Sequence, residues 1–405
     1  MSRKRILIIG DAVTPTGFAR VIRSISQPLH KDFELHQLAT RYEGQPHDYP
    51  WQLYQASKGK SVYGYDQVVP LVDLIKPDIV FLLYDIPYQL PYMRELRKAS
   101  HRAKVVMYSP VESGPIAPEM MRDLSGVSRY VLYTDYGRRE IEASLIRVRQ
   151  ENPAFEFPAL EIIPHGVDTH RFYPLSDDDD ARRIEARQAM RLDDPEHRDA
   201  FIVLNANRNM PRKRIDLTIQ GFAEFARDKP AKVKLYLHMA LQDTGWNVIA
   251  LAKRHGIYDR LIMTQADNKR PDFSDERLNL LYNACDVGIT TTTGEGWGMV
   301  AFEHGATRAA QIMPRHTSLA DLWKDAAEFV EPVMKLTWPG NLTDGHIVSP
   351  QGVAAALQRV YEDRSYRDAL AQAAYENATR SELRWSAAVK LWSELFDELI
   401  NSGSP

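Results

Sequence analysis

The segment VGITTTTGEGWGMVAFE, residues 287–303, carries the pattern that decides the fold of the second half of the chain. A short apolar run predicts a strand over 287–292, the glycines at 294–298 predict a turn, and a helix begins directly afterwards. Strand, glycine turn and helix in this order are typical of an open α/β sheet, in which ligands bind at the carboxyl ends of the strands. The segment therefore predicts an architecture and the place of a binding site together.

The same alternation of short apolar runs and helical segments continues along the whole chain. In the first half, strands are predicted at 5–10, 33–39, 78–84, 104–109, 129–134 and 161–166. In the second half, they are predicted at 201–207, 233–239, 260–265, 287–292 and 310–314. Helices separate most of them, as at 215–228 and 275–284. Two such series predict two doubly wound α/β domains that face each other across a cleft.

Length and composition are those of an ordinary two-domain protein. A chain of 405 residues is too long for one comfortable core, and its net charge of −3 gives no overall attraction to nucleic acid or anionic membrane. The single cysteine, Cys285, cannot form an internal disulfide, which fits a reducing compartment. No apolar run reaches the roughly 7–15 residues of a signal peptide or the ~20 of a membrane span. We expect a soluble, cytoplasmic protein, with peripheral membrane contact left open.

The expected domains are an N-terminal one over 1–172 and a C-terminal one over 173–384. A final helix over 385–405, whose aromatic stripe includes Trp392 and Phe396, is expected to pack back on the first domain. Four aspartates at 177–180 lie in a charge-dense segment between the halves. They are interpreted as the acidic start of a helix rather than as a metal-binding motif.

Glu303 occupies a position at which an apolar side chain is expected. Its neighbours one helical turn away are small or apolar: Met299, Val300, Ala306 and Thr307. Burying an unpaired carboxylate is costly, so Glu303 needs either a permanent partner or a ligand with hydroxyl donors, such as a ribose. Glu295, at the start of the same helix, is either a helix-start carboxylate or a second ligand contact.

A basic cluster follows the strand predicted at 201–207. The segment NANRNMPRKRIDL, residues 205–217, contains Arg208, Arg212, Lys213 and Arg214. A solvated loop is one interpretation. The other is a diphosphate clamp, because arginine binds phosphate in bidentate geometry and lysine adds a point charge. Cleavage of a sugar–diphosphate bond leaves negative charge on the phosphates, and fixed cations favour that transition state.

The first loop, GDAVTPTGFARV at residues 10–21, lies between the first strand and its helix. Gly17 is placed to present backbone amides to a phosphate or an acceptor. The dinucleotide pattern G-x-G-x-x-G is absent, because only Gly10 and Gly17 are present. This absence argues against a nicotinamide or flavin enzyme.

Four segments together resemble the family 4 retaining nucleotide-sugar glycosyltransferases, which have the GT-B fold. GEGWGMVAFE (294–303) resembles their E-x7-E signature, and RNMPRK (208–213) resembles their Arg-x4-Lys diphosphate clamp. IIPHGVDTHRFYP (162–174) is similar to their interdomain segment, and FSDERLNLLYNACDVGI (273–289) to the segment before the signature. The four occur in the family's order, which makes the combination more specific than any one of them.

The resemblance implies a role for each matching residue. Glu303 would bind the donor ribose and Glu295 the transferred sugar, while Arg208 and Lys213 would hold the diphosphate. Glu295, Arg208 and Lys213 are thus the expected catalytic residues. The other expected donor contacts are Gly296, Trp297, Gly298, Met299 and Gly17. Such enzymes retain anomeric configuration, and they need no metal and no cofactor beyond the nucleoside-diphosphate sugar.

The chain departs from the family pattern at three places. Ser109 and Pro110 stand where members often carry a histidine near the reacting sugar. Glu112 could take an acceptor-side role or be a plain loop carboxylate. His165 replaces the usual asparagine of the interdomain segment, and ALQDTGW (240–246) replaces a glycine-rich turn, so recognition of the nucleobase is not carried over.

The resulting hypothesis is a hexosyltransferase-type enzyme that moves a sugar from a nucleoside diphosphate to a hydroxyl of a glycan, a lipid or a small molecule. One alternative is a glycosyltransferase acting on a hydroxylated DNA base, because the first half interleaves basic and aromatic residues. These are Arg20, Arg23, Arg41, Arg94, Arg97, Lys98, Arg102, Lys104, Tyr49, Trp51, Tyr54, Tyr63 and Tyr65. A further alternative is a non-catalytic nucleotide-sugar-binding protein. The donor base, the sugar, the acceptor and the oligomeric state do not follow from the sequence, and residues 42–66 are interpreted as an insertion-like loop.

Overall fold

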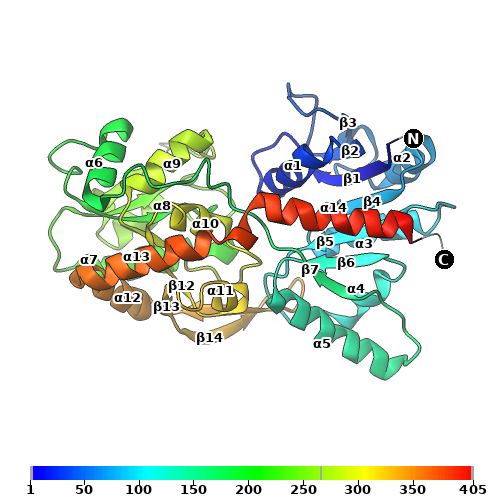
Figure 1. Cartoon of the computed structure of the whole chain (residues 1–405). Helices are drawn as coiled ribbons and strands as arrows, with labels where there is room; N and C mark the ends of the chain where they lie inside the picture. Colours follow the sequence, from blue (N-terminus) through cyan, green and yellow to red (C-terminus); the bar gives the residue numbers. More distant parts are fainter. Residues whose placement is uncertain (1–2, 265–266, 403–405) are drawn as a thin grey trace. The chain divides into compact units, whose positions relative to one another are not determined.

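The computed structural model describes residues 3–264 and 267–402 and divides the chain into two compact units (Figure 1). Unit 1 comprises Met1–Gly166 together with Trp385–Pro405, and unit 2 comprises Val167–Arg384. The domain boundary expected at residue 172 lies inside unit 2 in this division. Each unit has its own parallel sheet and its own core.

Unit 1 is built on a seven-stranded parallel sheet with the order β3-β2-β1-β4-β5-β6-β7. The strands are β1 (Arg5–Asp11), β2 (Glu34–Thr40), β3 (Gln52–Gln55), β4 (Ile79–Leu83), β5 (Lys104–Ser109), β6 (Arg129–Leu132) and β7 (Leu160–Ile162). The strand order reverses between β1 and β4, which are paired through Ile6–Ile79 to Ile9–Leu82. The central strand β4 is apolar and buried at every position, as expected where both faces of the sheet are covered.

Helices cover both faces of this sheet. They are α1 (Gly17–Leu29), α2 (Val68–Ile75), α3 (Ile86–Leu96), α4 (Pro118–Asp123), α5 (Asp135–Glu151) and α14 (Trp385–Asn401). Leu7 and Val80 belong to the core beneath α2 to α5. The opposite face is covered by α1 and α14, and there Phe81 meets Trp392 with ring centroids 4.8 Å apart.

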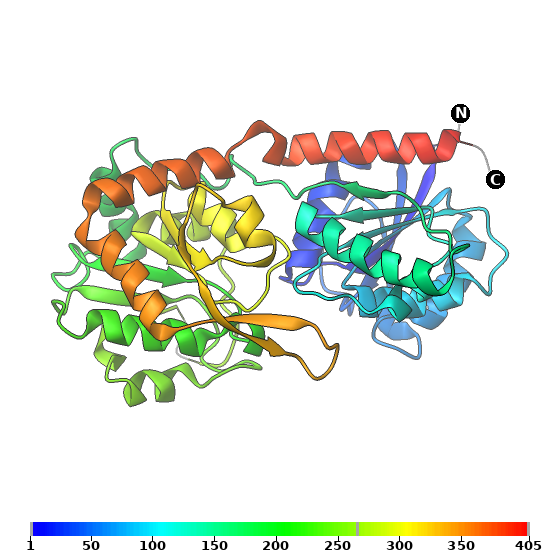
Figure 2. The same ribbon diagram turned by 90° about the horizontal axis from the view of Figure 1, so that it is seen from below.

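Helix α14 therefore completes unit 1 although it follows unit 2 in the sequence (Figure 2). Its buried residues include Trp392 and Phe396, and Phe396 also contacts Phe33 edge-on at 6.0 Å. The aromatic stripe is core, as its spacing predicts. No helix in the described part of the chain is long and apolar enough to cross a membrane.

Unit 2 is built on a six-stranded parallel sheet with the order β10-β9-β8-β11-β12-β13. The strands are β8 (Phe201–Asn205), β9 (Val233–Leu237), β10 (Leu261–Met263), β11 (Val287–Ile289), β12 (Ala310–Pro314) and β13 (Glu328–Val330). The helices are α6 (Asp179–Met190), α7 (Ile215–Ala226), α8 (Val248–Arg254), α9 (Asp275–Ala284), α10 (Met299–Gly305), α11 (Thr317–Leu322), α12 (Pro350–Glu362) and α13 (Arg364–Ala378). The order reverses between β8 and β11, so this sheet too is doubly wound.

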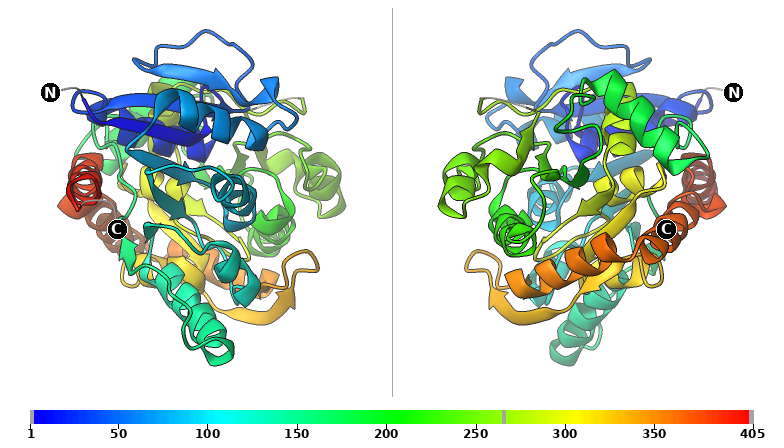
Figure 3. Two further views of the ribbon diagram at one scale, coloured as in Figure 1. Left: turned by 90° about the vertical axis from the view of Figure 1, so that its right-hand side faces the viewer. Right: turned by 90° about the vertical axis from the view of Figure 1, so that its left-hand side faces the viewer.

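A two-stranded antiparallel hairpin, β14 (Pro332–Thr337) and β15 (Asp344–Val348), leaves the body of unit 2 after β13. Figure 2 shows it in orange as a projecting ribbon, and Figure 3 shows the same ribbon from two further sides. Every predicted strand is present, although Gln265, the end of one of them, lies outside the described residues. The strands β3, β13, β14 and β15 were not predicted, and the supposed loop 42–66 contains β3 and the short 3-10 helices Ala56–Lys58 and Tyr65–Gln67.

The aspartate run at 177–180 forms the start of α6, as interpreted from the sequence. Asp178 is the N-cap residue, and its side chain accepts a hydrogen bond from the amide of Ala181. The remainder of the segment is less solvated than its charge suggests. Arg182, Arg183 and Arg187 of α6 are buried, and Arg187 donates to the buried carboxylate of Asp286 at 2.9 Å.

Candidate functional site

Two of the predicted motifs meet at the point in unit 2 where the strand order reverses. The basic segment follows β8 and forms a 3-10 helix at Pro211–Lys213, and the glycine loop follows β11 and leads into α10. Because β8 and β11 are parallel neighbours, their carboxyl ends lie side by side at one edge of the sheet. Ligands of open α/β sheets bind at this position.

Lys213 and Glu295 form a buried ion pair at this edge. The Nζ of Lys213 donates to Oε2 of Glu295, and the two residues are 9% and 8% exposed. The two segments that carry them are joined by a backbone hydrogen bond, because the amide of Thr293 donates to the carbonyl of Arg212 at 2.9 Å. The structure thus joins the predicted sugar contact and the predicted diphosphate contact directly.

Arg212 is a site residue that the sequence analysis placed only in the basic cluster. Its Nη1 lies 3.5 Å from Oε2 of Glu295 and donates to the carbonyl of Gly294 at 2.6 Å. The same nitrogen reaches Oγ1 of Thr292 at 3.3 Å. Arg212 therefore fixes the glycine loop, which we call the donor loop (residues 290–298), and adds a second cation beside Glu295.

The charge state of Glu295 follows from these two cations. Burial alone raises the pKa of a carboxyl group, but the charges of Lys213 and Arg212 outweigh burial and lower the pKa of Glu295 below its ordinary value. The carboxylate is thus ionised at neutral pH. It is suited to accepting hydrogen bonds from sugar hydroxyls and unsuited to donating a proton.

Glu303 is buried, as its apolar surroundings predict. It lies in α10, is 8% exposed, and accepts a hydrogen bond from the hydroxyl of Tyr282 at 3.1 Å. Tyr282 lies in α9, which the sequence predicts as a helix. The structure therefore gives Glu303 a permanent hydrogen-bonding neighbour, Tyr282.

The residues between the two glutamates shape the start of α10. Gly298 has φ of +90°, a left-handed conformation that favours glycine, and a Cβ there would lie 3.3 Å from Leu319. Gly296 and Trp297 are buried, and the indole of Trp297 stacks on Phe302 with centroids 4.9 Å apart. Met299 begins the helix. The side chain of Trp297 is thus packed into the protein, at 3% exposure.

Arg208 occupies a different environment from Lys213. Its Nε and Nη2 donate to the two carboxylate oxygens of Asp243 at 2.6 and 3.2 Å, and its side chain is 41% exposed. This pairing lowers the pKa of Asp243, mainly through the hydrogen bond from Arg208. Of the two cations expected to hold the diphosphate, Lys213 is therefore buried, whereas Arg208 is exposed and forms an ion pair with Asp243.

A pair of stacked histidines supports the donor loop. Nε2 of His316 lies 2.9 Å from the carbonyl oxygen of Thr292, and the two imidazoles of His316 and His346 stack at 5.0 Å. The adjacent Thr317 accepts a hydrogen bond from the amide of Glu295 at 3.2 Å. Because a carbonyl oxygen accepts, Nε2 of His316 carries the proton, and the ring is neutral since burial lowers its pKa to about 4.

His304 makes unit 2 sensitive to acid. Burial lowers the pKa of His304 to about 3, whereas an unfolded histidine titrates near 6.5. Between these values the unfolded chain binds one more proton, so the free energy of unfolding should fall as pH falls, by about 1.4 kcal/mol per unit. Because His316 is buried with a lowered pKa as well, we expect His304→Phe to reduce, but not abolish, the dependence of Tm on pH between 6.5 and 4.5. An unchanged slope in thermal unfolding scans would contradict this.

The remaining predicted residues lie in unit 1. Gly17 is exposed at the start of α1, where Thr16 is the N-cap residue and donates to the buried carboxylate of Asp11 at 2.8 Å. Ser109 is fully buried, and its hydroxyl donates to the side-chain oxygen of Gln89 at 2.8 Å. Glu112 is half-buried in the loop after β5.

His165, the residue that replaces the family's asparagine, is part of an aromatic cluster in unit 1. Its ring lies 4.0 Å from that of Tyr133, and its Nδ1 is 2.9 Å from the hydroxyl of Tyr108. That hydroxyl donates its proton to the carbonyl of Ile163 at 2.6 Å, so Nδ1 of His165 is the donor in the second contact. Burial lowers the pKa of His165 to about 3. Position 165 therefore holds a buried, neutral imidazole in place of the asparagine.

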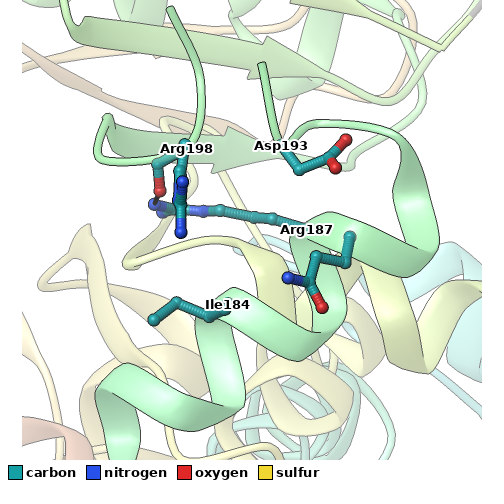
Figure 4. A pocket seen from close by; sticks show the side chains of 5 residues that line it. Ile184, Arg187, Asp193 and Arg198 are labelled. Carbon is teal, nitrogen blue, oxygen red and sulfur yellow. Dashed lines mark hydrogen bonds between the residues drawn. The ribbon is translucent and has the colours of Figure 1, made fainter. Parts of the chain in front are cut away.

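A small cavity of about 100 Å³ lies elsewhere in unit 2, beside α6 (Figure 4). Its lining residues are Ile184, Arg187, Gln188, Asp193 and Arg198. Nη1 of Arg187 donates to the carbonyl of Arg198 at 2.9 Å, as Figure 4 shows. None of the residues that line the cavity is predicted to bind the donor. The cavity lies where the buried Arg187 of α6 packs.

Sequence comparisons relate the chain to glycosyltransferases. No family model matches the chain. The D-inositol 3-phosphate glycosyltransferase of Salinispora tropica is 27% identical over 248 residues, which are 60% of this chain and 46% of that protein. The mannosylfructose-phosphate synthase of Agrobacterium fabrum is 26% identical over 163 residues, or 40% of this chain and 33% of that protein. The chain thus spans about half the length, or less, of these curated relatives.

Two solved structures have a similar fold over nearly the whole length of this chain. Sucrose-phosphate synthase of Thermosynechococcus elongatus has a TM-score of 0.74 at 15% identity and covers 99% of this chain and 100% of its own. The Anabaena protein HepE, solved with UDP and glucose, has a TM-score of 0.69 at 16% identity, with coverage of 98% and 100%. Identities this low show the fold alone, and the fold is GT-B, with two doubly wound Rossmann-like domains.

The fold of the chain is GT-B, and its sequence relatives support the resemblance to the family 4 glycosyltransferases. The chain is thus similar to glycosyltransferases in sequence and to GT-B proteins in fold. The names of these two relatives describe different reactions, so the particular reaction of this chain has to be argued from its own residues.

Proposed function

We propose that the protein transfers a sugar from a nucleoside-diphosphate donor to a hydroxyl acceptor with retention of anomeric configuration and without a metal ion. The observation that carries the proposal is the buried Lys213–Glu295 pair, with Arg212 beside it, at the carboxyl ends of β8 and β11. A cationic pair suits a diphosphate, and an ionised carboxylate suits sugar hydroxyls. HepE, a neighbour in fold, was solved with UDP and glucose, which is consistent with such a donor.

In this proposal the donor loop and the basic segment divide the donor between them. Lys213 and Arg212 hold the diphosphate, with Arg208 joining them when the donor displaces its contact to Asp243. Glu295 accepts hydrogen bonds from the transferred sugar, and Glu303 accepts them from the ribose. The backbone of residues 296–299 lies along the sugar and the phosphate. From the resemblance, Gly17 is assigned to the donor and Glu112 to the acceptor, whereas Ser109 is fully buried and bonded to Gln89, which does not suit the acceptor role expected of it.

The transfer step needs no protein nucleophile. The bond from C1 of the sugar to the phosphate oxygen breaks while the acceptor oxygen forms its bond to C1 on the same face. The acceptor proton passes to the departing phosphate oxygen. Lys213 and Arg212 stabilise the negative charge that develops on the diphosphate in the transition state. Fixed positive charges lower the activation barrier mainly through this stabilisation.

A DNA acceptor has less support from unit 1 than the sequence suggests. Several of the basic residues that motivated it are paired with neighbouring carboxylates, which reduces the charge available for phosphates. The pairs are Arg23–Asp48, Arg41–Asp11, Arg94–Asp123 and Lys98–Glu95. We therefore favour a glycan, lipid or small-molecule acceptor.

A donor screen tests the proposal. Purified protein is incubated with UDP-, GDP-, ADP- and dTDP-sugars, and nucleotide release and nucleotide-sugar binding are measured with and without EDTA. We expect one nucleotide class to bind and to be turned over slowly by water, with no loss in EDTA. Binding of none of these donors would overturn the donor assignment, and loss of turnover in EDTA would overturn the metal independence.

A further inference from the structure

The hairpin of β14 and β15 displays an apolar surface that the donor site does not use. We call it the hairpin surface and define it as Met334, Leu336, Trp338 and Leu342. Met334, Leu336 and Leu342 are 56%, 43% and 68% exposed, and Trp338 is partly exposed. Large apolar side chains are normally exposed singly, so a group of them on one projecting element indicates a binding surface.

The hairpin surface begins at the donor loop. In β15, the amide of His346 donates to the carbonyl of Thr293 at 2.8 Å. At the neighbouring Gly345, a Cβ would lie 2.8 Å from Nε1 of Trp338 and 3.1 Å from the side chain of Thr293. The indole of Trp338 and the donor loop therefore approach the same point. Thr293 is two residues from Glu295, so the apolar surface starts beside the expected sugar.

The hairpin is shaped to display these side chains rather than to bury them. Its backbone is paired from Met334–Ile347 to Thr337–Asp344, and its end is closed by the hydrogen bonds from the amide of Trp338 to Thr343 and from that of Leu342 to Trp338. Leu342 has φ of +55°, a conformation that is unfavourable for a residue with a Cβ. The chain thus holds a leucine in a strained backbone conformation and leaves 68% of it exposed.

The charge and the backbone of the hairpin restrict the kind of molecule that can bind the hairpin surface. The end of the hairpin, WPGNL at residues 338–342, carries no charge, and the nearby Lys335 and Asp344 lie 3.9 Å from each other. The five residues at the end of the hairpin therefore offer no cation to the phosphates of a nucleic acid, and Asn341 is their one polar side chain besides the indole of Trp338. Addition of a strand from a second chain is disfavoured by Pro332 and by the irregular register between Pro332 and Met334.

We propose that the hairpin surface binds the hydrocarbon portion of an amphiphilic acceptor, so that the sugar is transferred to a hydroxyl on a lipid or lipid-like molecule. The inference rests on the proposed function and selects among the acceptor classes that it leaves open. The hydrocarbon lies along Leu336 and Trp338, and the hydroxyl-bearing end lies toward Thr293 and the donor loop.

The test uses monomeric alkyl maltosides with chains of eight, ten and twelve carbons, below their micelle concentrations. Binding to the full-length protein is measured by calorimetry in the presence of the nucleotide found in the donor screen. We expect Kd to fall by up to about fourfold for each methylene that is buried. The triple variant Met334→Ser/Leu336→Ser/Leu342→Ser should weaken binding of the twelve-carbon ligand at least tenfold.

Two controls keep the outcomes distinct. Ile184→Ser removes an apolar side chain of the same 43% exposure as Leu336, but on α6, and should bind like wild type. Release of nucleotide from the donor by water should be equal in wild type and triple variant, since the variant leaves the donor site intact. If the wild-type protein binds no donor, the proposed function is refuted. The dependence of maltoside binding on chain length is a separate measurement and tests the hairpin surface alone.

Three results would overturn the inference. One is maltoside affinity that does not depend on chain length or on the triple variant. Another is a dimer in light scattering that the triple variant converts to a monomer, because a second copy would then cover the surface. The third is binding to phosphatidylcholine vesicles that the triple variant abolishes while monomeric maltosides do not bind, which would identify a bilayer contact instead.

Discussion

A Lys213→Met protein is expected to lose sugar transfer by about a hundredfold to a thousandfold in kcat, the size of effect seen when one fixed charge-stabilising group is removed. Lys213 is the buried cation that contacts Glu295, and in the proposed reaction it stabilises the leaving diphosphate. The variant also leaves the buried carboxylate of Glu295 without its nearest cation, while Arg212 stays at 3.5 Å. We therefore expect a loss of roughly 3–5 kcal/mol in unfolding free energy as well. Steady-state transfer and denaturant unfolding measure the two effects.

The double variant Lys213→Met/Glu295→Gln separates chemistry from folding. It removes both charges of the pair, so much of the lost stability should return, while transfer should stay at the level of the single variant or below. Recovery of activity together with stability would show that Lys213 has only a structural role. Wild-type activity in the single variant would show that the donor site is wrongly assigned.

Glu303→Ala is expected to raise the KM for the donor by about ten- to a hundredfold, with a smaller change in kcat. Hydrogen bonds to a charged group contribute roughly 1.5–3 kcal/mol, and the ribose is remote from the bond that breaks, so the loss should be in binding that ground state and transition state share. At donor concentrations below KM, turnover would be almost abolished. Initial rates over a range of donor concentrations give both parameters.

Tyr282→Phe is the matched control for Glu303. It removes the hydroxyl that donates to Glu303 at 3.1 Å but leaves the carboxylate in place. We expect a cost of about 1 kcal/mol in stability and less than a threefold change in KM. If Tyr282→Phe raised KM as much as Glu303→Ala, the carboxylate would act through the packing of α9 and α10 rather than through the ligand.

The parallel sheets could be predicted because strands that are buried on both faces are continuous apolar runs. The segment IVFLL of β4 is buried at every position and has no other simple interpretation. The missed strands lack this signal. β3, with the sequence QLYQ, and β13, with EFV, lie at sheet edges, and β14 is exposed along its length. Short, half-covered strands cannot be told from loops by periodicity.

The site could be predicted as a set of residues but not as a set of contacts. Lys213 and Glu295 are separated by 82 positions, and only the adjacency of β8 and β11 brings them together. The spacing of Arg208 and Lys213 could not show that the 3-10 turn between them directs Arg212 to Glu295 and leaves Arg208 to Asp243. The buried arginines of α6 were missed for a related reason, since their partner Asp286 follows α9.

The position of α14 has a consequence for the order in which the protein folds. Unit 1 lacks one of its covering helices until α14 has been synthesised after unit 2, because Trp392 and Phe396 close the face of the sheet that Phe81 occupies. Unit 2 is continuous in sequence and can be complete earlier. A nascent chain would therefore carry an uncovered apolar face while all of unit 2 is made, which favours chaperone binding. Deletion of α14 should for the same reason destabilise unit 1.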